Sequence, residues 1–217
     1  MRPGDRATDV LLLMFDEVEL LDFAGPYEVF TTANRVARRD APSADAARMP
    51  VDMPAPPPFR LRTASPDGRP VQARAGLGLQ PDLALHDAAA PDLLIVPGGV
   101  VERLQQDPVF LATLARLGRD AGRVASICTG AFLLADAGLL RNAEATTHWE
   151  DLEALGRRHP QLRLRPDRRW VDTGRVLSSA GIAAGLDLSL HLVRRCAGVE
   201  LAQRTARQLD YPWDPTE

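Results

Sequence analysis

A cysteine placed where a strand gives way to a helix is the feature of this sequence that most directly suggests chemistry. Residues 124–127 form a short apolar run typical of a strand, and a helical spacing of small and apolar residues begins after Cys128. At such a turn, the unpaired N–H groups of the helix N-terminus and the positive end of its dipole favour a thiolate. A buried core residue is the alternative, because cysteine is often found in protein interiors. The position favours a nucleophile with a lowered pKa.

An acid and a histidine could act beside this cysteine. Asp22 stands among apolar residues just before Gly25 and Pro26, so it is either a helix-capping group or a carboxyl whose pKa is raised near a site. The residues alone favour the cap. His148 ends a strand pattern at residues 144–147, which places it on the rim where open α/β sheets bind ligands. A lone histidine is more often structural, so a catalytic role and a packing role both stay open.

Two consecutive glycines mark another stretch of backbone that could contact a ligand. Gly98 and Gly99 follow the apolar run at residues 91–96. Glycines after a parallel strand allow close backbone approach, so their N–H groups can face a bound molecule. An ordinary strand-to-helix connection is the alternative. We expect the pair to contribute only together with other groups at the same edge of a sheet.

Strand and helix patterns alternate along most of the chain, and they determine where these side chains meet. Strands are predicted at residues 10–15, 59–64, 91–96, 124–127, 144–147, 170–172 and 175–178, with one or two short edge strands within 69–79. Helices are predicted at residues 19–36, as one helix or one broken at Gly25-Pro26, and at 101–105, 108–119, 129–138, 149–158 and 182–197. The alternation predicts an α/β fold with a largely parallel sheet and helices on both faces. The carboxyl ends of its strands would bring the groups above together.

A proline-rich stretch interrupts the alternation. Residues 37–58 carry six of the 18 prolines and show neither a helical nor a strand period. We expect an exposed, mobile loop insertion there rather than a linker between domains. The whole chain, residues 1–217, is accordingly expected to form a single domain.

Composition excludes several classes of function. All 26 basic residues are arginine, so a Schiff-base lysine and a phosphate-loop lysine are ruled out. A net charge of −3 gives no general electrostatic reason to bind nucleic acid or an acidic membrane surface. The four histidines and two cysteines lack the spacing of metal ligands, and no cofactor fingerprint occurs. We expect no metal and no cofactor.

The remaining cysteine and the start of the chain indicate the cellular setting. Cys196 lies late in an apolar helical run, so we expect it in the core and expect no disulfide. The N-terminus leads charged residues directly into a strand pattern without a secretory apolar region, and no run is long enough to span a membrane. These features predict a soluble cytoplasmic protein.

The motifs around these residues resemble those of the ThiJ/PfpI superfamily, within the class I glutamine amidotransferase-like, flavodoxin-like fold. The stretch S-I-C-T-G-A-F-L-L-A-D-A-G-L-L contains Cys128, and T-T-H-W places His148 twenty positions later. The motifs L-D-F-A-G-P-Y-E-V-F, V-P-G-G and S-S-A-G-I-A-A-G-L-D-L-S-L-H-L-V extend the resemblance over nearly the whole chain. The resemblance implies a nucleophile elbow at the cysteine.

The resemblance also implies roles for individual residues. Cys128 would be the nucleophile and Asp22 the acid beside it, with His148 near the sulfur. Backbone N–H groups of Gly99 and Thr129 would face negative charge that develops on the substrate. The residues implied to bind substrate are Gly98, Gly99, Thr129 and Gly130. Thr129 stands where PfpI-type proteases have a histidine, so the resemblance does not imply peptidase activity.

Two branches of the superfamily share these motifs and imply different functions. Isonitrile hydratase-like enzymes add water to the terminal carbon of an isonitrile and release an N-substituted formamide. The other branch is the amino-terminal domain of AraC-type transcription regulators, which precedes a helix-turn-helix module. Because the sequence stops at Glu217, we expect no nucleic acid to be bound by this chain alone. Glyoxalase or deglycase activity on 2-oxoaldehydes is a third alternative, since it needs the same thiolate.

These alternatives make different demands on the cysteine. In the enzyme hypothesis, the Cys128 thiolate attacks an electrophilic carbon of a small uncharged substrate, protonated Asp22 donates a proton, and water resolves the adduct. In the sensor hypothesis, the cysteine is retained for ligand binding or peroxide sensing. Homodimers are common in the superfamily, so a homodimer with a small-molecule substrate or ligand is expected, without a membrane.

Overall fold

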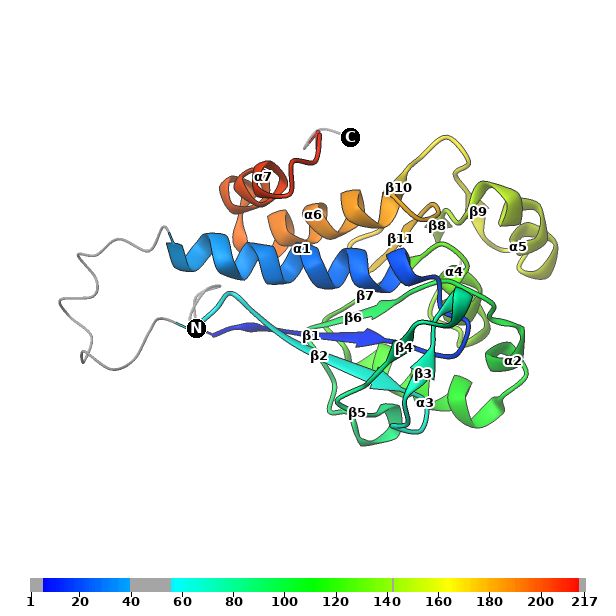
Figure 1. Cartoon of the computed structure of the whole chain (residues 1–217). Helices are drawn as coiled ribbons and strands as arrows, with labels where there is room; N and C mark the ends of the chain where they lie inside the picture. Colours follow the sequence, from blue (N-terminus) through cyan, green and yellow to red (C-terminus); the bar gives the residue numbers. More distant parts are fainter. Residues whose placement is uncertain (1–5, 40–55, 142, 215–217) are drawn as a thin grey trace.

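The centre of the molecule is a largely parallel sheet. The computed structural model describes residues 6–39, 56–141 and 143–214 (Figure 1). The strand order is β10-β11-β7-β6-β1-β2-β5, and every neighbouring pair is parallel except the β10–β11 hairpin at one edge. The strands are β1 (Thr8–Leu13), β2 (Phe59–Ser65), β5 (Leu83–Ala84), β6 (Leu93–Val96), β7 (Arg123–Ile127), β10 (Trp170–Asp172) and β11 (Val176–Ser179). The predicted α/β fold class is confirmed.

The middle strands are buried on both faces because their sequences are almost entirely apolar. Leu11 in β1, Leu94 in β6 and Ile127 in β7 are at most 1% exposed. Continuous apolar runs of this kind are typical of parallel strands that are covered on both sides. Parallel pairing of β1 with β6 and of β6 with β7 places the carboxyl ends of all three strands at one edge of the sheet.

Helices cover both faces of the sheet. The helices α1 (Leu20–Arg39), α6 (Ala184–Ala197) and α7 (Val199–Gln208) pack against one another on one side (Figure 1). The helix α3 (Pro108–Asp120) connects β6 to β7 in the direction opposite to the β1–α1–β2 connection, so right-handed crossovers place it on the other face. There it contacts α4 (Gly130–Asp136). The short helices α2 (Glu102–Gln105) and α5 (Leu152–Arg158) lie near the carboxyl edge (Figure 1).

The strand pattern at residues 144–147 is shorter than predicted and lies outside the central sheet. Only β8 (Glu144–Ala145) is extended, and it pairs with β9 (Arg163–Leu164). The reason is that the Thr146 N–H donates to the hydroxyl of Ser178 at 2.9 Å instead of to a neighbouring strand. A second small ribbon, β3 (Val71–Gln72) with β4 (Gly78–Leu79), accounts for the edge strands predicted within residues 69–79. Single 3-10 turns complete the elements: Arg74–Gly76, Leu85–Asp87 and Trp149–Asp151.

The first helix is continuous, so the alternative of a break at Gly25-Pro26 is wrong. Pro26 lies in the second turn of α1, where its missing N–H removes one backbone hydrogen bond. The buried face continues beyond it through Val29 and Phe30, and their packing outweighs this loss. Residues 37–39 of the predicted loop insertion belong to the end of α1. Residues 40–55 of that predicted insertion lie outside the described part of the chain.

Two features near the C-terminus differ from expectation. The helix α7 was not predicted, although its buried residues Ala202, Thr205 and Ala206 have the i, i+3, i+4 spacing of one helix face. Cys196 is half-buried at the margin of the core and is not fully enclosed, and it is a free thiol. No helix in the described ranges has both the length and the apolar character needed to cross a membrane.

Candidate active site

Cys128 occupies a strained turn between β7 and α4. Its backbone φ is 53°, in the left-handed region that costs a non-glycine residue about 1 kcal/mol or more. The Cys128 N–H donates to the Ser179 carbonyl at 3.2 Å, and the Thr147 hydroxyl donates to the Cys128 carbonyl at 2.7 Å. These two hydrogen bonds hold the conformation. Strained backbone of this kind is concentrated at functional sites, and the turn has the shape of a nucleophile elbow.

A buried carboxyl adjoins the thiol. Asp22, in the first turn of α1, is inaccessible to solvent, and its Oδ2 accepts the N–H of Gly98 at 3.1 Å. The Cys128 thiol and the Ile182 N–H also interact with this carboxyl, and both lower its pKa. A Cβ placed on Gly98 would lie 2.7 Å from Asp22 Oδ2 and 2.8 Å from Cys128 Cβ. The acid and the cysteine therefore flank one glycine, and Asp22 is a buried partner of the cysteine rather than an exposed helix cap.

Burial raises the pKa of both members of this pair. For Asp22, burial is the largest cause, the Gly98 N–H opposes it and the charge of Glu19 adds to it, so the pKa reaches about 7. For Cys128, burial again comes first and the charge of Asp22 second, and the pKa rises to about 12 despite the Thr129 N–H. The lowered cysteine pKa expected from the helix N-terminus is therefore wrong. Between these two values the pair holds one proton, which belongs to both groups.

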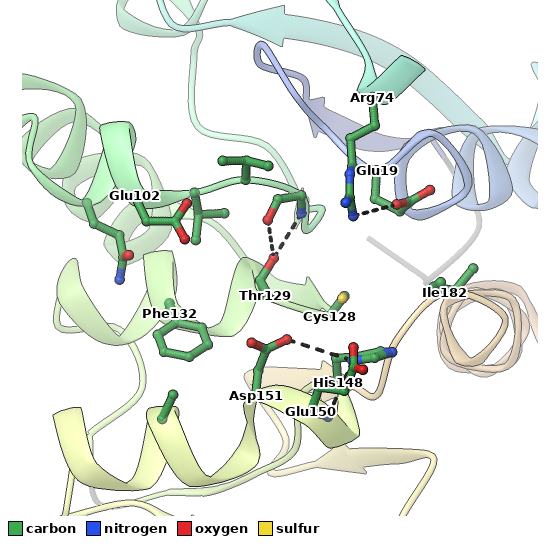
Figure 2. A pocket seen from close by; sticks show the side chains of 15 residues that line it. Glu19, Arg74, Glu102, Cys128, Thr129, Phe132, His148, Glu150, Asp151 and Ile182 are labelled. Atoms are coloured by element: carbon green, nitrogen blue, oxygen red, sulfur yellow. Dashed lines mark hydrogen bonds and ion pairs between the residues drawn. The ribbon is translucent and has the colours of Figure 1, made fainter.

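The Cys128 sulfur faces a cavity of about 420 Å³ at the carboxyl edge of the sheet (Figure 2). Four of the residues singled out from the sequence line this cavity: Gly99, Cys128, Thr129 and His148. Its walls also carry apolar side chains, among them Val100, Phe132 and Ile182. Within the described residues, no three His, Cys, Asp or Glu side chains are grouped so that they could hold a metal ion. The cavity suits a small, partly apolar molecule.

Two of the glycines implied to bind substrate lie behind the cavity and serve its construction. Gly98 packs against both Asp22 and Cys128, where a Cβ would not fit. A Cβ on Gly130 would lie 2.3 Å from the Val96 carbonyl oxygen, so only glycine lets α4 begin this close to the end of β6. Both residues support the site through close backbone packing.

The expected donation of the Gly99 N–H to a substrate is not available in this arrangement. That N–H donates to the Thr129 hydroxyl at 2.9 Å, and the same hydroxyl donates to the Gly99 carbonyl at 2.8 Å. Gly99 has a φ of 143°, and a Cβ there would lie 2.3 Å from the Glu17 carbonyl oxygen. The Thr129 side chain therefore ties the glycine loop to the start of α4. The Thr129 N–H is the backbone donor that faces the sulfur.

His148 is positioned by its neighbours and makes no hydrogen bond to the Cys128 sulfur among the contacts of the described residues. It precedes the 3-10 turn Trp149–Asp151, and its Nδ1 accepts the Glu150 N–H at 3.4 Å. Its ring packs on Gly181, where a Cβ would lie 2.0 Å from His148 Cδ2. Carboxylate oxygens of Glu150 and Asp151 lie 3.5 Å and 3.8 Å from Nδ1. The ring therefore forms one wall of the cavity and holds two acids near it.

Three further cavity residues were not singled out from the sequence. Phe132 follows Thr129 by three positions, so the predicted helix could have placed both on one face. Ile182 has a φ of 53°, an outlier for a β-branched residue that no sequence pattern indicates. Asp151 lies in the 3-10 turn Trp149–Asp151, within a stretch that was predicted to be helical. Their positions follow from the folded chain alone.

Comparison with known proteins places this geometry in a family. The sequence profile of the DJ-1/PfpI family matches residues 8–195, which include all strands of the central sheet and the cavity. The chain belongs to the DJ-1/PfpI family. Its structure resembles that of a ThiJ/PfpI family protein from Pseudomonas syringae, with a TM-score of 0.79, 23% identity, and coverage of 99% of this chain and 79% of that one. At this identity the likeness shows the fold alone.

Relatives within the DJ-1/PfpI family have different functions. The chain is 31% identical over 94% of its length to an isonitrile hydratase from Pseudomonas putida, of which it covers 79%. It is 33% identical over 92% of its length to the HTH-type transcriptional regulator GbdR from Pseudomonas aeruginosa. The chain spans about half the length of that regulator, 49%. An enzyme and a regulator are thus similar to it at comparable identity.

Proposed function

We propose that this DJ-1/PfpI family protein is a cysteine-dependent enzyme that adds water to a small uncharged electrophile, with an isonitrile as the best-matching substrate. The observation that carries the proposal is the buried Asp22–Cys128 pair, which places a nucleophile and a shared proton at a cavity of about 420 Å³. The 31% identity to an isonitrile hydratase supports the choice of substrate.

The pair performs the first step by moving one proton. Near neutral pH, the Asp22 carboxylate accepts the thiol proton while the sulfur attacks the terminal isonitrile carbon, and a sulfur–carbon bond forms. Protonated Asp22 then gives this proton to the same carbon, which leaves a thioimidate on Cys128. Asp22 therefore acts as a base and then as an acid, whereas a permanently protonated carboxyl could only donate.

Water completes the reaction. Its oxygen adds to the thioimidate carbon and the nitrogen gains a proton. The sulfur–carbon bond then breaks, and its electron pair returns to the sulfur. The products are an N-substituted formamide and the restored thiol. The Thr129 N–H beside the sulfur stabilises the negative charge that develops on it in both steps.

The test is incubation with an alkyl isonitrile and measurement of the formamide by mass spectrometry. We expect turnover by the parent protein and a loss of at least about 1,000-fold in Cys128→Ser, because the nucleophile is removed. Cys196→Ser is the matched control and is expected to keep full activity, since this thiol lies on α6 outside the cavity. Full activity in Cys128→Ser contradicts the proposal. Methylglyoxal, with lactate as the product, tests the glyoxalase alternative in parallel.

A ligand-sensing role without turnover is the second candidate function. The similarity to regulators supports it, because the chain is 33% identical to GbdR and 35% identical over 150 residues to the regulator CdhR. In this case the cavity binds a small molecule and the cysteine contributes to binding alone. Stabilisation of the protein by a small molecule without product formation, equal in the parent and in Cys128→Ser, favours the sensor.

A further inference from the structure

We propose that Asp151 is a second catalytic acid–base residue, which activates the water that releases the product from Cys128. This inference rests on the proposed function and assigns the second half of the reaction to a residue on the open side of the sulfur. It separates the two proton transfers in space, with Asp22 behind the sulfur and Asp151 in front of it.

Asp22 is badly placed for the water step. Its side chain is completely buried, and it does not line the cavity. Its Oδ2 is already engaged by the Gly98 N–H at 3.1 Å. Water that attacks a substrate bonded to Cys128 approaches from the cavity. A group that takes a proton from this water must therefore be a wall residue of the cavity.

Asp151 meets this requirement. Its carboxylate points into the cavity between Phe132 and Cys128 (Figure 2). The negative charge of Asp151 acts on the sulfur, because it is one of the causes of the raised pKa of Cys128. The Asp151 N–H donates to the His148 carbonyl at 2.9 Å, which fixes the turn, and Oδ2 lies 3.8 Å from His148 Nδ1. The backbone of the turn fixes Asp151 beside His148, with its carboxylate on the side of the nucleophile (Figure 2).

The other acids of the cavity are Glu19, Glu102 and Glu150, and they are less suited to this role; Glu102 is exposed. Glu19 is engaged in an ion pair with Arg74 at 3.3 Å. The side chain of Glu150 is 63% exposed, against 36% for Asp151. Burial is the largest cause of a raised pKa of Asp151, which brings its basicity closer to that needed to accept a proton from water. Glu150 and Glu102 add to this rise, and His148 opposes it.

Asp151 would take part in two proton transfers during water addition. The Asp151 carboxylate accepts one proton from water while the water oxygen bonds to the thioimidate carbon. Protonated Asp151 returns a proton to the nitrogen, so the adduct becomes a tetrahedral carbon that carries OH, NH and sulfur. When the sulfur–carbon bond breaks, the hydroxyl proton goes to the Asp22–Cys128 pair and the formamide carbonyl forms. No oxidant, metal or further reactant is needed.

The experiment compares adduct formation with turnover in Asp151→Asn, using an alkyl isonitrile. Intact-protein mass spectrometry follows the adduct on Cys128, and formamide release gives turnover. We expect adduct formation within about threefold of the parent rate and turnover reduced roughly 100-fold, so that the adduct accumulates. Asp151→Glu is expected to restore part of the turnover, because it keeps a carboxylate. The matched control is Glu153→Gln, an exposed acid on α5 that pairs with Arg157, and it should behave like the parent.

Each outcome decides a different point. Parental turnover in Asp151→Asn overturns the role of Asp151. A folded Asp151→Asn protein that loses adduct formation as well also overturns it, because Asp151 would then act in the first step or in folding. Glu150→Gln separates general charge effects from a specific one, since accumulation of adduct to the same extent in that variant contradicts the assignment. A parent protein that forms neither adduct nor formamide overturns the proposed function itself.

Discussion

At the scale of single residues, the chemistry depends on one proton held between Asp22 and Cys128. A thiol whose pKa is raised to about 12 is a weak nucleophile by itself, so it needs a base in contact with it. Asp22 supplies that base, because its pKa of about 7 leaves it ionised for much of the time near neutral pH. The same burial that raises both values keeps water away from the proton they share.

The raised pKa of Asp22 predicts that Asp22→Asn stabilises the protein in a pH-dependent way. The folded state holds the Asp22 proton up to about pH 7, whereas the unfolded chain loses it near 3.8. Stability of the parent therefore falls as the pH rises from about 4 to 7, at most about 1.4 kcal/mol per unit. Asn has the same shape and no charge to bury. Urea unfolding at several pH values should show the variant gaining up to about 4 kcal/mol at pH 8 and little at pH 4.

Asp9→Asn is expected to change the stability in the opposite direction, so it serves as a check. The pKa of Asp9 is lowered, because hydrogen bonds and charges of Arg62 and Arg60 outweigh its burial. Asp9→Asn should therefore lose stability at neutral pH, and the loss should shrink as the pH falls through the native pKa of Asp9. If Asp22→Asn is less stable than the parent at pH 8, the folded parent does not carry a destabilising buried charge at Asp22.

At the scale of elements, the loop after β6 is fixed between two other segments. The Glu19 N–H donates to the Gly98 carbonyl at 2.9 Å, and the Val100 N–H donates to the Glu17 carbonyl at 3.0 Å. The Thr129 hydroxyl holds the same loop on its other side. The loop therefore sets the distance between the start of α1, which carries Asp22, and the start of α4, which follows Cys128.

This geometry predicts a large effect of one added methyl group. Gly98→Ala would place a Cβ within 2.8 Å of Asp22, Cys128 and the Thr129 N atom, so the pair must move apart. We expect activity to fall at least about 100-fold, since small displacements of catalytic groups are costly, and stability to fall by about 1–3 kcal/mol. Gly78→Ala in β4 is the control, because nothing lies within 4 Å of its Cβ. Equal effects of the two substitutions on activity would contradict the account.

The elements also show how far the sequence alone could lead. Apolar runs followed by turns located β1, β6 and β7 and therefore the edge where Asp22, Gly99, Cys128 and His148 meet, because parallel strands end together. The burial of individual side chains in the folded protein could not be predicted in the same way. The raised pKa of Cys128 and the use of the Gly99 N–H by Thr129 depend on contacts between segments distant in the sequence. For the same reason, the place of Asp151 on the cavity wall had no sequence signal.

At the scale of the whole molecule, the parallel sheet brings three loops to one edge, and DJ-1/PfpI membership accounts for that architecture. The similar proteins include an isonitrile hydratase and HTH-type transcriptional regulators. A homodimer remains a prediction for this chain. A dimer would form through the surface of the molecule, whereas Asp22 and Cys128 both belong to one chain.

The most direct test of the central claim is the titration of Asp22 by carboxyl-carbon NMR of protein labelled at aspartate. The signal is assigned as the one absent from Asp22→Asn. We expect it to titrate near pH 7, and we expect Cys128→Ala to raise this midpoint modestly, because the thiol's hydrogen bond to the carboxylate opposes the rise that burial causes. A midpoint near 4 would show a carboxylate that is always charged at neutral pH, and it would contradict the shared proton on which the proposed mechanism depends.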